Sequence, residues 1–557
     1  MKDGIKKYKP FENVDIKNRQ WPGRVITEAP VWCSVDLRDG NQALVNPMNA
    51  GQKLQFFKLL ADIGFKQIEV GFPSASQTEY DILRELIEGG HIPDDVTIQV
   101  LTQCREHLIK KTFEAVQGAK SVIVHFYNST STLQRKVVFK KDMDGIAQIA
   151  VDGAKLIKKL SAEFDGNIQF EYSPESFSAT ETPFAVRICD EVMAALGASK
   201  DNKVILNLPS TVECSTPNRF ADQVEYFCDN IKHREAAIIS VHPHNDRGTG
   251  VAAAELALMA GAERVEGTLF GNGERTGNAD IITLALNMYT QSVDPKLDFS
   301  DLGRIRKIYE QSTAMPVHER HPYAGDLVFT AFSGSHQDAI NKGVLYMDSG
   351  KTEYWEVPYL PIDPADVGRA YEPLIRINSQ SGKGGAAYVL RSFGYDLPKG
   401  MHVEFGSVVT AYCDKLGAEI LPDQVLRIFQ DEYLNVPDGL TLVSQKIIEC
   451  DSQHDNPAVI LEGVLGTPDG NVDIHGRGNG PIDAFFHALK GIGIDEYQFM
   501  SYSQHAISSG SDSKAVAYIE LKNKAGKSIY GVGISGNTTR ASIRGILSAI
   551  NRDRREN

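Results

Sequence analysis

The stretch Ile238-Ile-Ser-Val-His-Pro-His-Asn-Asp246 sets the interpretation of the whole chain, because an apolar run ends in two imidazoles spaced two residues apart. Residues i and i+2 of an extended strand project from the same face, so His242 and His244 can approach a single point. Neutral imidazole is a common ligand of divalent metals. The pattern therefore predicts a metal site at the end of a strand, and two polar residues that cap backbone groups are the alternative.

Similar short apolar runs lie on either side of this one, and longer segments with helical periodicity separate them. The strand-like runs are Val31–Asp36, Gln67–Phe72, Thr97–Leu101, Ser121–Tyr127, Ile168–Tyr172, Lys203–Leu208, Ile238–His242 and Arg264–Phe270. The helical segments include Gln52–Ile63, Ser76–Glu88, Asp142–Ala162, Pro183–Leu196 and Pro217–Ile231. Strand-then-helix units in this number predict an α/β fold, the (β/α)8 TIM barrel. A doubly wound sheet is the competing fold, but nothing after the first strand resembles a dinucleotide loop.

The composition is that of a large globular protein. The chain has 557 residues, 42% of them hydrophobic, which is enough for about three or four domains. A net charge of −14 argues against nucleic acid or an anionic membrane as the main partner. The 7 cysteines form no CxxC pair and indicate reduced thiols. Because no targeting segment or membrane-spanning run is evident, we expect a cytoplasmic protein.

The pattern changes after the eighth unit and suggests further domains. We predict an N-terminal extension over 1–30, a catalytic barrel over 31–305, a linker with small helical subdomains over 306–430, and a C-terminal α+β regulatory domain over 431–557. The last residues, Asn551–Asn557, are expected to form a solvated tail.

Two similar segments near the C-terminus indicate a weak internal duplication. Gly478-Asn-Gly-Pro-Ile-Asp-Ala-Phe-Phe-His-Ala-Leu489 resembles Gly536-Asn-Thr-Thr-Arg-Ala-Ser-Ile-Arg-Gly-Ile-Leu547, and each follows two or three strand-like runs. Repeated strand–strand–helix units predict a small α+β domain. A helix entrance opened by glycine can hold a carboxylate through its N–H groups. Gly478, Asn479, Gly480, Gly536 and Asn537 are thus candidates for binding an amino-acid effector, with simple helix capping as the alternative.

Polar residues gather at the predicted ends of the barrel strands, where active sites of this fold lie. They are Arg38, Asp39, His125, Ser173, Glu175, Thr211, His242, His244 and the loop Gly271-Asn-Gly-Glu-Arg-Thr-Gly-Asn278. Asp39, His242 and His244 form an oxygen and nitrogen ligand set without thiolate, which suits Zn²⁺, Mn²⁺ or Mg²⁺. A metal held there could chelate a 2-oxo acid and polarise its keto group.

Arg38 can stabilise a developing oxyanion or enolate beside such a metal. In a straight strand Arg38 and Asp39 would point to opposite faces, so we expect the chain to bend at Gly40. A surface ion pair is the alternative role for Arg38.

Several of these motifs resemble those of one enzyme family. Leu37-Arg-Asp-Gly-Asn-Gln42, followed by Lys53, and His242-Pro-His-Asn-Asp-Arg-Gly-Thr-Gly250 resemble the two signature motifs of the 2-isopropylmalate/homocitrate synthase family. Leu269–Asn278, Ser333-Gly-Ser-His-Gln-Asp338 and Trp355-Glu-Val-Pro-Tyr359 extend the resemblance to its longer bacterial and fungal members. The resemblance covers nearly the whole chain and implies a metal-bearing (β/α)8 barrel that condenses acetyl-CoA with a 2-oxo acid.

Taken position by position, the resemblance also implies roles for individual residues. The implied metal ligands are Asp39, His242, His244 and Asn278. His125, Ser173, Glu175 and Thr211 match positions that line the 2-oxo acid pocket, with Arg38 near the reacting oxygen and Gln42 in the same first loop. His336 matches the family's catalytic histidine, and Tyr359 matches a tyrosine linked to activity and inhibitor response. Both lie in the linker of this subunit or of a partner, and Glu175 and His336 are the candidates for the base.

The implied reaction joins acetyl-CoA, 3-methyl-2-oxobutanoate and water to give 2-isopropylmalate and CoA, the committed step towards leucine. The resemblance further implies a divalent metal, K⁺ as an activator, and inhibition by leucine through the C-terminal domain. We also expect a homodimer. The alternatives are a sibling homocitrate or citramalate synthase, a lyase that cleaves a 3-hydroxy-3-methylglutaryl-type thioester, and a leucine-binding module on an inactive barrel.

Overall fold

A computed structural model describes residues 14–331, 334–350, 352, 354–371, 385–416, 420–450, 458–507 and 513–556. The first part of the predicted N-terminal extension, 1–13, lies outside the described residues. The chain divides into two compact units, and each is described by itself. The first comprises residues 1–329 and 362–370, and the second comprises residues 330–361 and 371–557.

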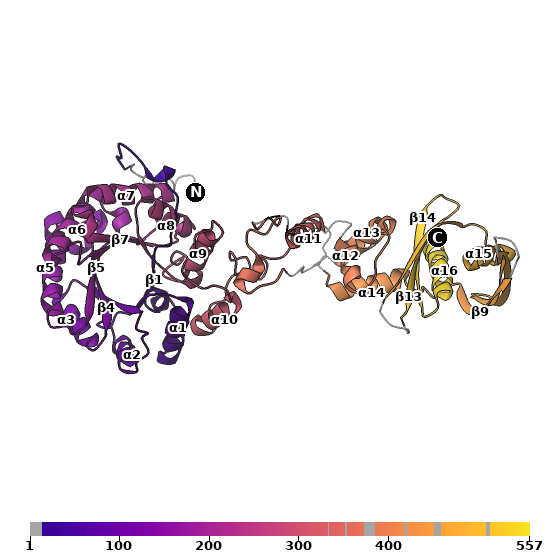
Figure 1. Ribbon diagram of the computed structural model, residues 1–557, viewed down its shortest axis with the longest axis horizontal. Coiled ribbons are helices and arrows are strands. Elements are labelled where there is room, and N and C mark those ends of the chain that lie inside the picture. Colours follow the sequence, from indigo (N-terminus) through magenta and orange to yellow (C-terminus); the bar gives the residue numbers. More distant parts are fainter. Residues whose placement is uncertain are drawn as a thin grey trace. The chain divides into compact units, whose positions relative to one another are not determined.

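Parallel strands close into a barrel in the first unit, which confirms the predicted (β/α)8 fold (Figure 1). They are β1 (Val31–Ser34), β2 (Gln67–Gly71), β3 (Thr97–Gln103), β4 (Ser121–Ser129), β5 (Asn167–Glu175), β6 (Val204–Ser210), β7 (Ala237–Pro243) and β8 (Arg264–Gly267). Each strand pairs with its neighbours in sequence, and β1 pairs with β8 to close the ring. Both faces of such strands are covered, which is why they form near-continuous apolar runs.

Helices surround the barrel on its outside (Figure 1). They are α1 (Ala50–Ile63), α2 (Gln77–Glu88), α3 (Glu106–Ala115), α5 (Met143–Ser161), α6 (Thr182–Leu196), α7 (Pro217–Asn230), α8 (Gly250–Met259), α9 (Ile281–Tyr289) and α10 (Leu302–Thr313), with the short α4 (Thr132–Gln134) in the loop after β4. Local sequence fixes their ends. Asn49 and Gln52 form a capping box at the start of α1, and Gly64 ends that helix with φ 113°.

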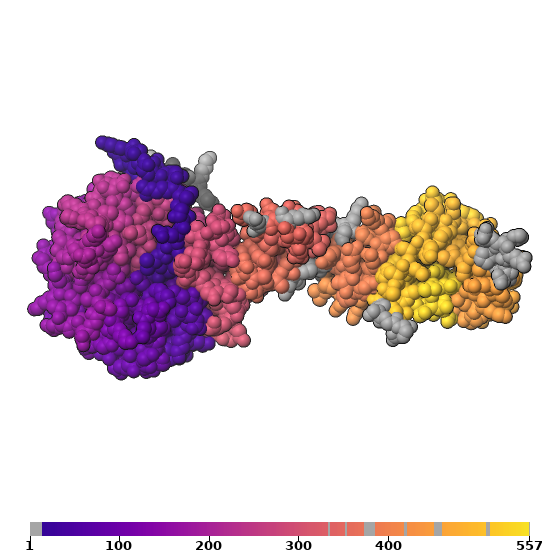
Figure 2. All heavy atoms as spheres, viewed as in Figure 1, coloured from indigo at the N-terminus to yellow at the C-terminus, as the bar shows by residue number. Residues whose placement is uncertain are grey.

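Residues 14–30 lie against the outside of the barrel, where Figure 2 shows the indigo segment crossing its surface. Arg19 Nε lies 2.6 Å from Asp222 Oδ1, and the Trp21 backbone N–H donates to Glu225 Oε1 over 2.7 Å. Both acids belong to α7. Charge-assisted hydrogen bonds to one helix thus hold the described part of the extension in place.

The first and last barrel strands are shorter than the sequence predicts. β1 ends at Ser34, and the chain turns at once into a tight π-helical turn over Asp36–Gly40. The expected bend at Gly40 is therefore wrong, because the chain already leaves the extended conformation at Val35. β8 ends at Gly267 and is followed by a turn in which Phe270 has φ 57°. These turns carry the loop side chains over the barrel mouth.

The second unit contains helices followed by two antiparallel sheets. Its helices are α11 (Gly334–Asp348), α12 (Gly385–Ser392), α13 (Lys399–Leu416), α14 (Pro422–Tyr433), α15 (Pro481–Gly491) and α16 (Thr538–Glu556). The sheets have the strand orders β11-β10-β9 and β12-β13-β14. Their strands are β9 (Thr441–Cys450), β10 (Ala458–Thr467), β11 (Gly470–Gly478), β12 (Gln498–Ala506), β13 (Ala515–Lys522) and β14 (Ser528–Ser535).

The predicted duplication is thus a repeated β-β-β-α unit, and the C-terminal α+β fold is confirmed. The last two strands of each repeat, β10 and β11 and then β13 and β14, are strand-like runs of the kind that the sequence predicts before Gly478 and Gly536. The first strands, β9 and β12, were not distinguished. Most side chains of β12 are exposed, so its sequence lacks the alternation of apolar and polar residues that marks a strand with one buried face.

Helices α12 to α14 share a core with the second sheet. Phe405 and Phe429 from the helices are buried in one cluster with Val516 and Val532 from β13 and β14. A boundary near residue 430 therefore cuts through a packed core, and the predicted domain limits stay predictions.

The C-terminal residues are not a solvated tail, so that expectation is wrong. α16 continues to Glu556, and the side chain of Arg552 is only 3% exposed. Its guanidinium lies 2.8 Å from Glu404 and 3.0 Å from Glu432, on α13 and α14. The charged terminus is therefore folded onto acidic partners far away in sequence. Among the helices that the structure describes, none has the length and apolar character needed to cross a membrane.

Candidate active site

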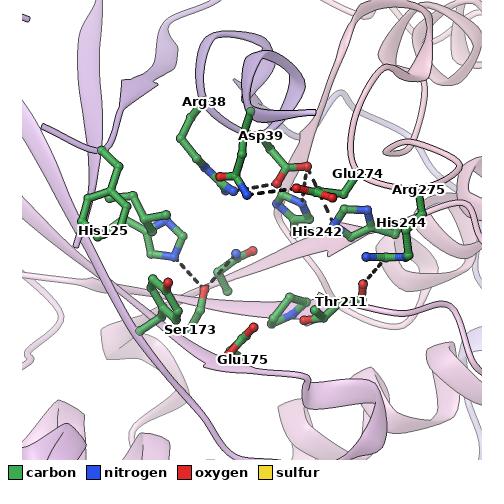
Figure 3. A pocket seen from close by; sticks show the side chains of 16 residues that line it. Arg38, Asp39, His125, Ser173, Glu175, Thr211, His242, His244, Glu274 and Arg275 are labelled. Carbon is green, nitrogen blue, oxygen red and sulfur yellow. Dashed lines mark hydrogen bonds and ion pairs between the residues drawn. The ribbon is translucent and has the colours of Figure 1, made fainter. Parts of the chain in front are cut away.

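A pocket of about 400 Å³ lies where the barrel strands end (Figure 3). The predicted residues that line it are Arg38, Asp39, Gln42, His125, Ser173, Glu175, Thr211, His242 and His244. The remaining lining residues are Phe72, Leu101, Tyr127, Asn207, Pro209, Glu274 and Arg275. Glu274 and Arg275 lie in the loop after β8, and the sequence alone assigns them no role. The pocket therefore gathers side chains from loops that are far apart in the chain.

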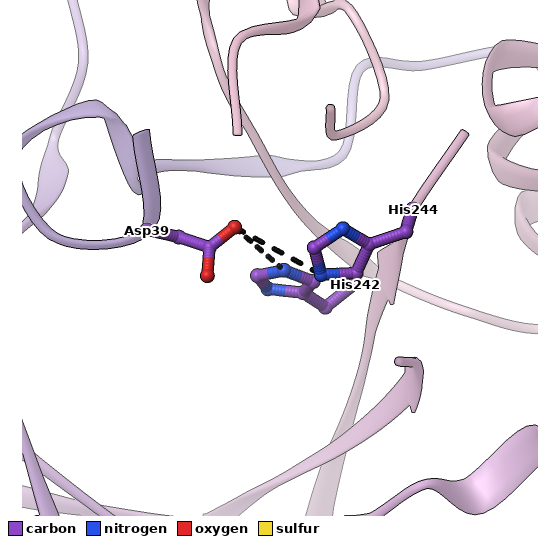
Figure 4. A group of neighbouring side chains, drawn as sticks. All are labelled: Asp39, His242 and His244. Atoms are coloured by element: carbon purple, nitrogen blue, oxygen red, sulfur yellow. Dashed lines mark ion pairs between the residues drawn. The ribbon is translucent and has the colours of Figure 1, made fainter. Parts of the chain in front are cut away.

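Asp39, His242 and His244 converge at the pocket wall (Figure 4). Asp39 comes from the turn after β1, His242 from the end of β7, and His244 from the residue that follows this strand. Asp39 Oδ2 lies 3.9 Å from His242 Nε2 and 3.8 Å from His244 Nε2. Two atoms that each lie about 2.1 Å from one zinc ion are at most about 4.2 Å apart, so each of these separations is compatible with a shared ion. The spacing of two residues has the geometric effect that the sequence predicts.

Neighbouring groups keep these three side chains in the protonation states that metal binding requires. His242 Nδ1 lies 2.8 Å from Glu266 Oε2, so Nδ1 carries the hydrogen and Nε2 is left to face Asp39. Burial lowers the pKa of His244 to about 4, which keeps its ring neutral. Burial opposes ionisation of Asp39, but Arg38 and the histidines outweigh it and lower its pKa to about 2.

Asn278 supplies a fourth candidate ligand beside this group. Its Nδ2 donates to Asp39 Oδ2 over 2.7 Å and to the Asn272 carbonyl over 2.9 Å. Its Oδ1 is buried and has no hydrogen-bond partner among the residues that the structure describes. An unsatisfied buried oxygen is costly unless something binds it. The donor set, two imidazoles, a carboxylate and a free amide oxygen, therefore fits a divalent metal.

Arg38 is held inside the pocket and is not a surface ion pair. One guanidinium nitrogen, NH1, lies 2.7 Å from Asp39 Oδ1, and Nε lies 2.6 Å from Glu69 Oε2. Glu69 is fully buried on β2, and Arg38 outweighs its burial and lowers its pKa. Sequence reasoning missed Glu69. Its only signal was a charged residue inside an apolar strand.

His125 and Ser173 form the deeper wall of the pocket. Ser173 Oγ lies 2.7 Å from His125 Nε2 and accepts a hydrogen bond from Asn207 Nδ2 over 3.1 Å. Figure 3 shows Ser173 and Glu175 across the pocket from Arg38 and Asp39. The pocket can thus present polar groups to opposite ends of one small substrate.

Glu175 and Thr211 are connected through a strained turn. The Ser129 hydroxyl donates to Glu175. Ser176, the next residue, has φ 62°, and its backbone N–H donates to Thr211 Oγ1 over 2.9 Å. A non-glycine residue in the left-handed region is sparsely populated and often lies at a functional site. Thr211 therefore holds the backbone that carries Glu175.

The pocket rim is tied together by the loop after β8. Gln42 donates to Glu274 over 3.0 Å. Arg275 Nε lies 2.6 Å from Asp246 Oδ1. These contacts join the loops after β1, β7 and β8, the same loops that supply the candidate metal ligands.

A buried network of charged residues lies beneath the pocket. Arg264 contacts Glu266 at 3.0 Å and Glu171 at 3.3 Å, and all three side chains are fully buried. Burial raises the pKa of Glu171 well above its usual range. His125, Glu171 and Glu266 form a second group with oxygen and nitrogen atoms close enough to hold an ion. None of the three glutamates Glu69, Glu171 and Glu266 was singled out from the sequence.

His336 and Tyr359 belong to the second unit, and neither residue lines the barrel pocket. Their rings lie against each other, with centroids 4.1 Å apart and an interplanar angle of 31°. Tyr359 is exposed and has φ 66°. The two linker residues are thus brought together, and their catalytic roles stay predictions.

The candidate effector residues are divided between two places. Asn479 and Gly480 line a pocket of about 630 Å³ at the start of α15, together with Phe486, Phe499 and Tyr502. The start of α15 has no side-chain cap. In the second repeat, Asn537 Oδ1 accepts from the Arg540 backbone N–H over 2.9 Å. Helix capping therefore explains Asn537, and Gly478, Gly536 and Asn537 do not line the pocket.

Comparison with known proteins agrees with this arrangement. A family model described as HMGL-like matches residues 29–308, which span the barrel and its rim. A model described as alpha-isopropylmalate synthase, post-catalytic domain-like, matches residues 326–391, and one described as LeuA allosteric (dimerisation) domain matches residues 419–553. The barrel with its candidate metal site is thus of the HMGL-like class.

Relatives of high sequence identity define the family of this chain within the class. A 2-isopropylmalate synthase from Clostridium acetobutylicum is 55% identical over 98% of this chain and 99% of its own length. Those from Agrobacterium fabrum and Pseudomonas entomophila are 54% and 52% identical, each over 99% of this chain and 99% and 98% of their own lengths. The chain belongs to the 2-isopropylmalate synthase family, as the resemblance in its motifs predicted.

Proposed function

We propose that this chain condenses acetyl-CoA with 3-methyl-2-oxobutanoate and water to give 2-isopropylmalate and CoA, the committed step of leucine biosynthesis. Relatives that are more than half identical over almost the whole chain carry the name of that activity. The observation that carries the proposal is the convergence of Asp39, His242 and His244 on one point of the pocket wall.

The proposed cofactor is a divalent metal held by Asp39, His242, His244 and Asn278. Mg²⁺, Mn²⁺ and Zn²⁺ all suit these ligands, and K⁺ is proposed as an activator. When bound, the metal would polarise the keto group of the 2-oxo acid and stabilise negative charge on its oxygen.

The protein's own groups complete this chemistry. Arg38 is fixed by Glu69 and Asp39 and presents a permanent positive charge where negative charge develops on the keto oxygen. Glu175 lines the pocket, and Thr211 holds its backbone, so a carboxylate is positioned within the site. Glu175 and His336 remain the two candidates for the base that removes a proton from the acetyl methyl group.

Leucine is the proposed effector, and the pocket at the start of α15 is its proposed site. The domain type matched there supports this role. The first turn of α15, which has no side-chain cap from Gly480, offers N–H groups that suit a carboxylate, although Pro481 contributes none and the Asp483 side chain accepts from the Asn479 N–H over 2.9 Å. Phe486 and Phe499 offer an apolar wall with ring centroids 5.6 Å apart. A homodimer in the cytoplasm is the proposed state of the protein.

A direct test is to measure CoA release with purified full-length protein across a panel of 2-oxo acids. We expect 3-methyl-2-oxobutanoate to react fastest and Asp39→Ala to abolish turnover. Asp94→Ala is a matched control, since Asp94 is an exposed aspartate that pairs with Lys120 on the protein surface. A faster reaction with 2-oxoglutarate or pyruvate would assign the chain to a sibling synthase. Light scattering that gave the mass of a monomer would contradict the homodimer.

The other readings have less support. A lyase would need neither of the C-terminal domain types that match this chain. An inactive barrel that only binds leucine would have no reason to place two buried histidines, His242 and His244, beside Asp39.

A further inference from the structure

Lys53 carries a buried charge that the proposed chemistry does not use. It belongs to the first signature motif, yet its side chain is only 1% exposed and it does not line the barrel pocket. Its Nζ lies 2.5 Å from Glu79 Oε1, which is its one ion pair among the described residues. A buried charge is costly unless it is paired. Because Lys53 reaches neither the pocket nor the solvent, any role in the reaction has to pass through Glu79.

Glu79 connects this lysine to the end of strand β2. It lies in the first turn of α2, where its backbone N–H donates to the Ser76 side chain. Oε1 of its carboxylate takes the Lys53 ammonium, and Oε2 accepts the backbone N–H of Phe72 over 3.3 Å. One carboxylate thus joins α1, α2 and the residue that follows β2.

The end of β2 is shaped to receive this carboxylate. Gly71 is the last residue of the strand, and a Cβ at its position would collide with Glu79 Oε2. The pairing of β2 with β3 shifts in register between Glu69 and Gly71, which marks a β-bulge. Bulges are common next to active sites, where they change the direction of a side chain. The bulge and the missing side chain together let Glu79 reach the backbone of Phe72.

Phe72 follows the bulge directly and lines the barrel pocket. Leu101 of β3 and Tyr127 of β4 line it as well, so the ends of three neighbouring strands supply one apolar wall. His242 lies on β7, which is opposite β3 in the closed ring of strands. A 2-oxo acid whose two oxygens faced the candidate metal site would therefore direct its apolar chain towards this wall.

We propose that Lys53 and Glu79 are positioning residues that hold Phe72 against the apolar chain of the 2-oxo acid and so set the preference for a branched chain. This inference rests on the proposed function. Lys53 keeps the Glu79 carboxylate in place, and the carboxylate fixes the backbone N–H of Phe72. Neither charged residue touches the substrate. The candidate metal ligands and Arg38 are other side chains, so metal binding should not change.

Two nearly isosteric substitutions break this connection in different ways. Glu79→Gln leaves one acceptor oxygen for two donors, the Lys53 ammonium and the Phe72 N–H, so one donor loses its partner. Lys53→Met keeps the carboxylate but removes the charge that holds it, and Glu79 is 20% exposed and can turn to solvent. Because both substitutions act on one contact, the double variant should lose little more than either single variant.

The experiment measures kcat/KM of the full-length enzyme for 3-methyl-2-oxobutanoate and for pyruvate, which lacks the two methyl groups of the branched chain. Each variant should lower the ratio of the two values at least about tenfold, the scale on which an apolar pocket discriminates single methylene groups. The loss should appear mainly as a higher KM for the branched acid. Calorimetric titration of both acids into Mn²⁺-loaded protein, without acetyl-CoA, should show the same change in the ratio of Kd values.

Two matched controls lie on the same helices. Glu88→Gln changes an exposed glutamate of α2 that pairs with Arg84 at 2.6 Å. Lys58→Met changes an exposed lysine of α1. Both variants should keep the wild-type ratio, which would exclude a general effect of charge or helix stability.

Ratios within about twofold of wild type in both Glu79→Gln and Lys53→Met would overturn the inference. An equal loss for both acids would also overturn it, because that is the result of a purely structural role, and so would losses that add fully in the double variant. Should Lys53→Met misfold, Glu79→Gln decides the question, since its amide oxygen still offers Lys53 a partner. Absence of turnover by wild type with every 2-oxo acid would instead reject the proposed function, and the ratio of Kd values would then test the inference by itself.

Discussion

Glu266 determines which ring nitrogen of His242 carries the hydrogen. Glu266→Gln should therefore weaken metal binding without changing any ligand. Both carboxylate oxygens of Glu266 act only as hydrogen-bond acceptors, and the groups around them are donors. Oε2 faces His242 Nδ1 at 2.8 Å and Asn207 Nδ2 at 3.1 Å. Oε1 faces Arg264 at 3.0 Å and Gln99 Nε2 at 2.8 Å.

A glutamine has one amide oxygen and one NH₂ group, and neither orientation suits this site. With its NH₂ toward Arg264 and Gln99, donors oppose donors in a fully buried place. With its NH₂ toward His242, Nδ1 must accept, the hydrogen moves to Nε2, and the nitrogen that faces Asp39 can no longer bind a metal. Loss of such a supporting contact costs 10- to 100-fold in affinity, about 1.4–2.7 kcal/mol.

The assay is calorimetric titration of Mn²⁺ into metal-free full-length protein, which needs no turnover. Glu263→Gln is the matched control, because Glu263 lies before β8 at the opposite end of the barrel, partly exposed and paired with Arg234. It should bind Mn²⁺ as wild type does. Affinity of Glu266→Gln within about twofold of wild type, in a variant with an unchanged unfolding transition, would refute the argument that Glu266 sets the tautomer of His242.

Three further predictions concern stability and regulation. Arg552→Ala should lower the free energy of unfolding of the second unit by about 3 kcal/mol. This is the lower end of the range for a broken buried ion pair, because the two glutamate partners are partly exposed. An unchanged urea unfolding curve, followed by circular dichroism, would contradict this. Burial raises the pKa of Asp36 to about 7, so between pH 4 and pH 7, roughly, the folded state binds a proton that the unfolded state has lost, and stability falls as pH rises. Asp36→Asn should flatten this decline, worth up to about 4 kcal/mol, and parallel curves of melting temperature against pH for both proteins would disprove it. Phe499→Ala should raise the leucine concentration needed for half-inhibition at least tenfold, by loss of about 1.4 kcal/mol of apolar contact, whereas Met500→Ala, exposed and outside the pocket, should not; equal inhibition curves for all three proteins would remove leucine from this pocket.

The barrel and much of its site could be predicted because their signals are local. Alternating strand and helix segments fix the fold class, and two histidines at positions i and i+2 fix a shared face. Strand ends in a (β/α)8 barrel meet at one mouth, so the fold class alone places His125 and Ser173 together. The motif resemblance added Asn278, whose buried amide oxygen has no hydrogen-bond partner among the described residues, and its role as a ligand stays a prediction.

What escaped the sequence depends on partners distant in the chain. Glu69 and Glu266 are single charges within apolar strands, and their importance comes from Arg38 and His242 on other strands. Arg552 looks like part of a solvated terminus until α13 and α14 bring two glutamates to it, more than a hundred residues earlier. The path of the chain at Arg38 also escaped, because a five-residue π-helical turn leaves no periodicity to recognise.

The candidate ligands straddle the seam where the ring of strands is closed. Asp39 follows β1, Asn278 follows β8, and the histidine pair ends β7, while β1 itself is only 4 residues long. An ion bound by all of them would connect the first strand of the barrel to its last two strands. Its binding free energy would add to the free energy needed to separate β1 from β8. Chelation would then destabilise the closure of the barrel as well as abolish its chemistry.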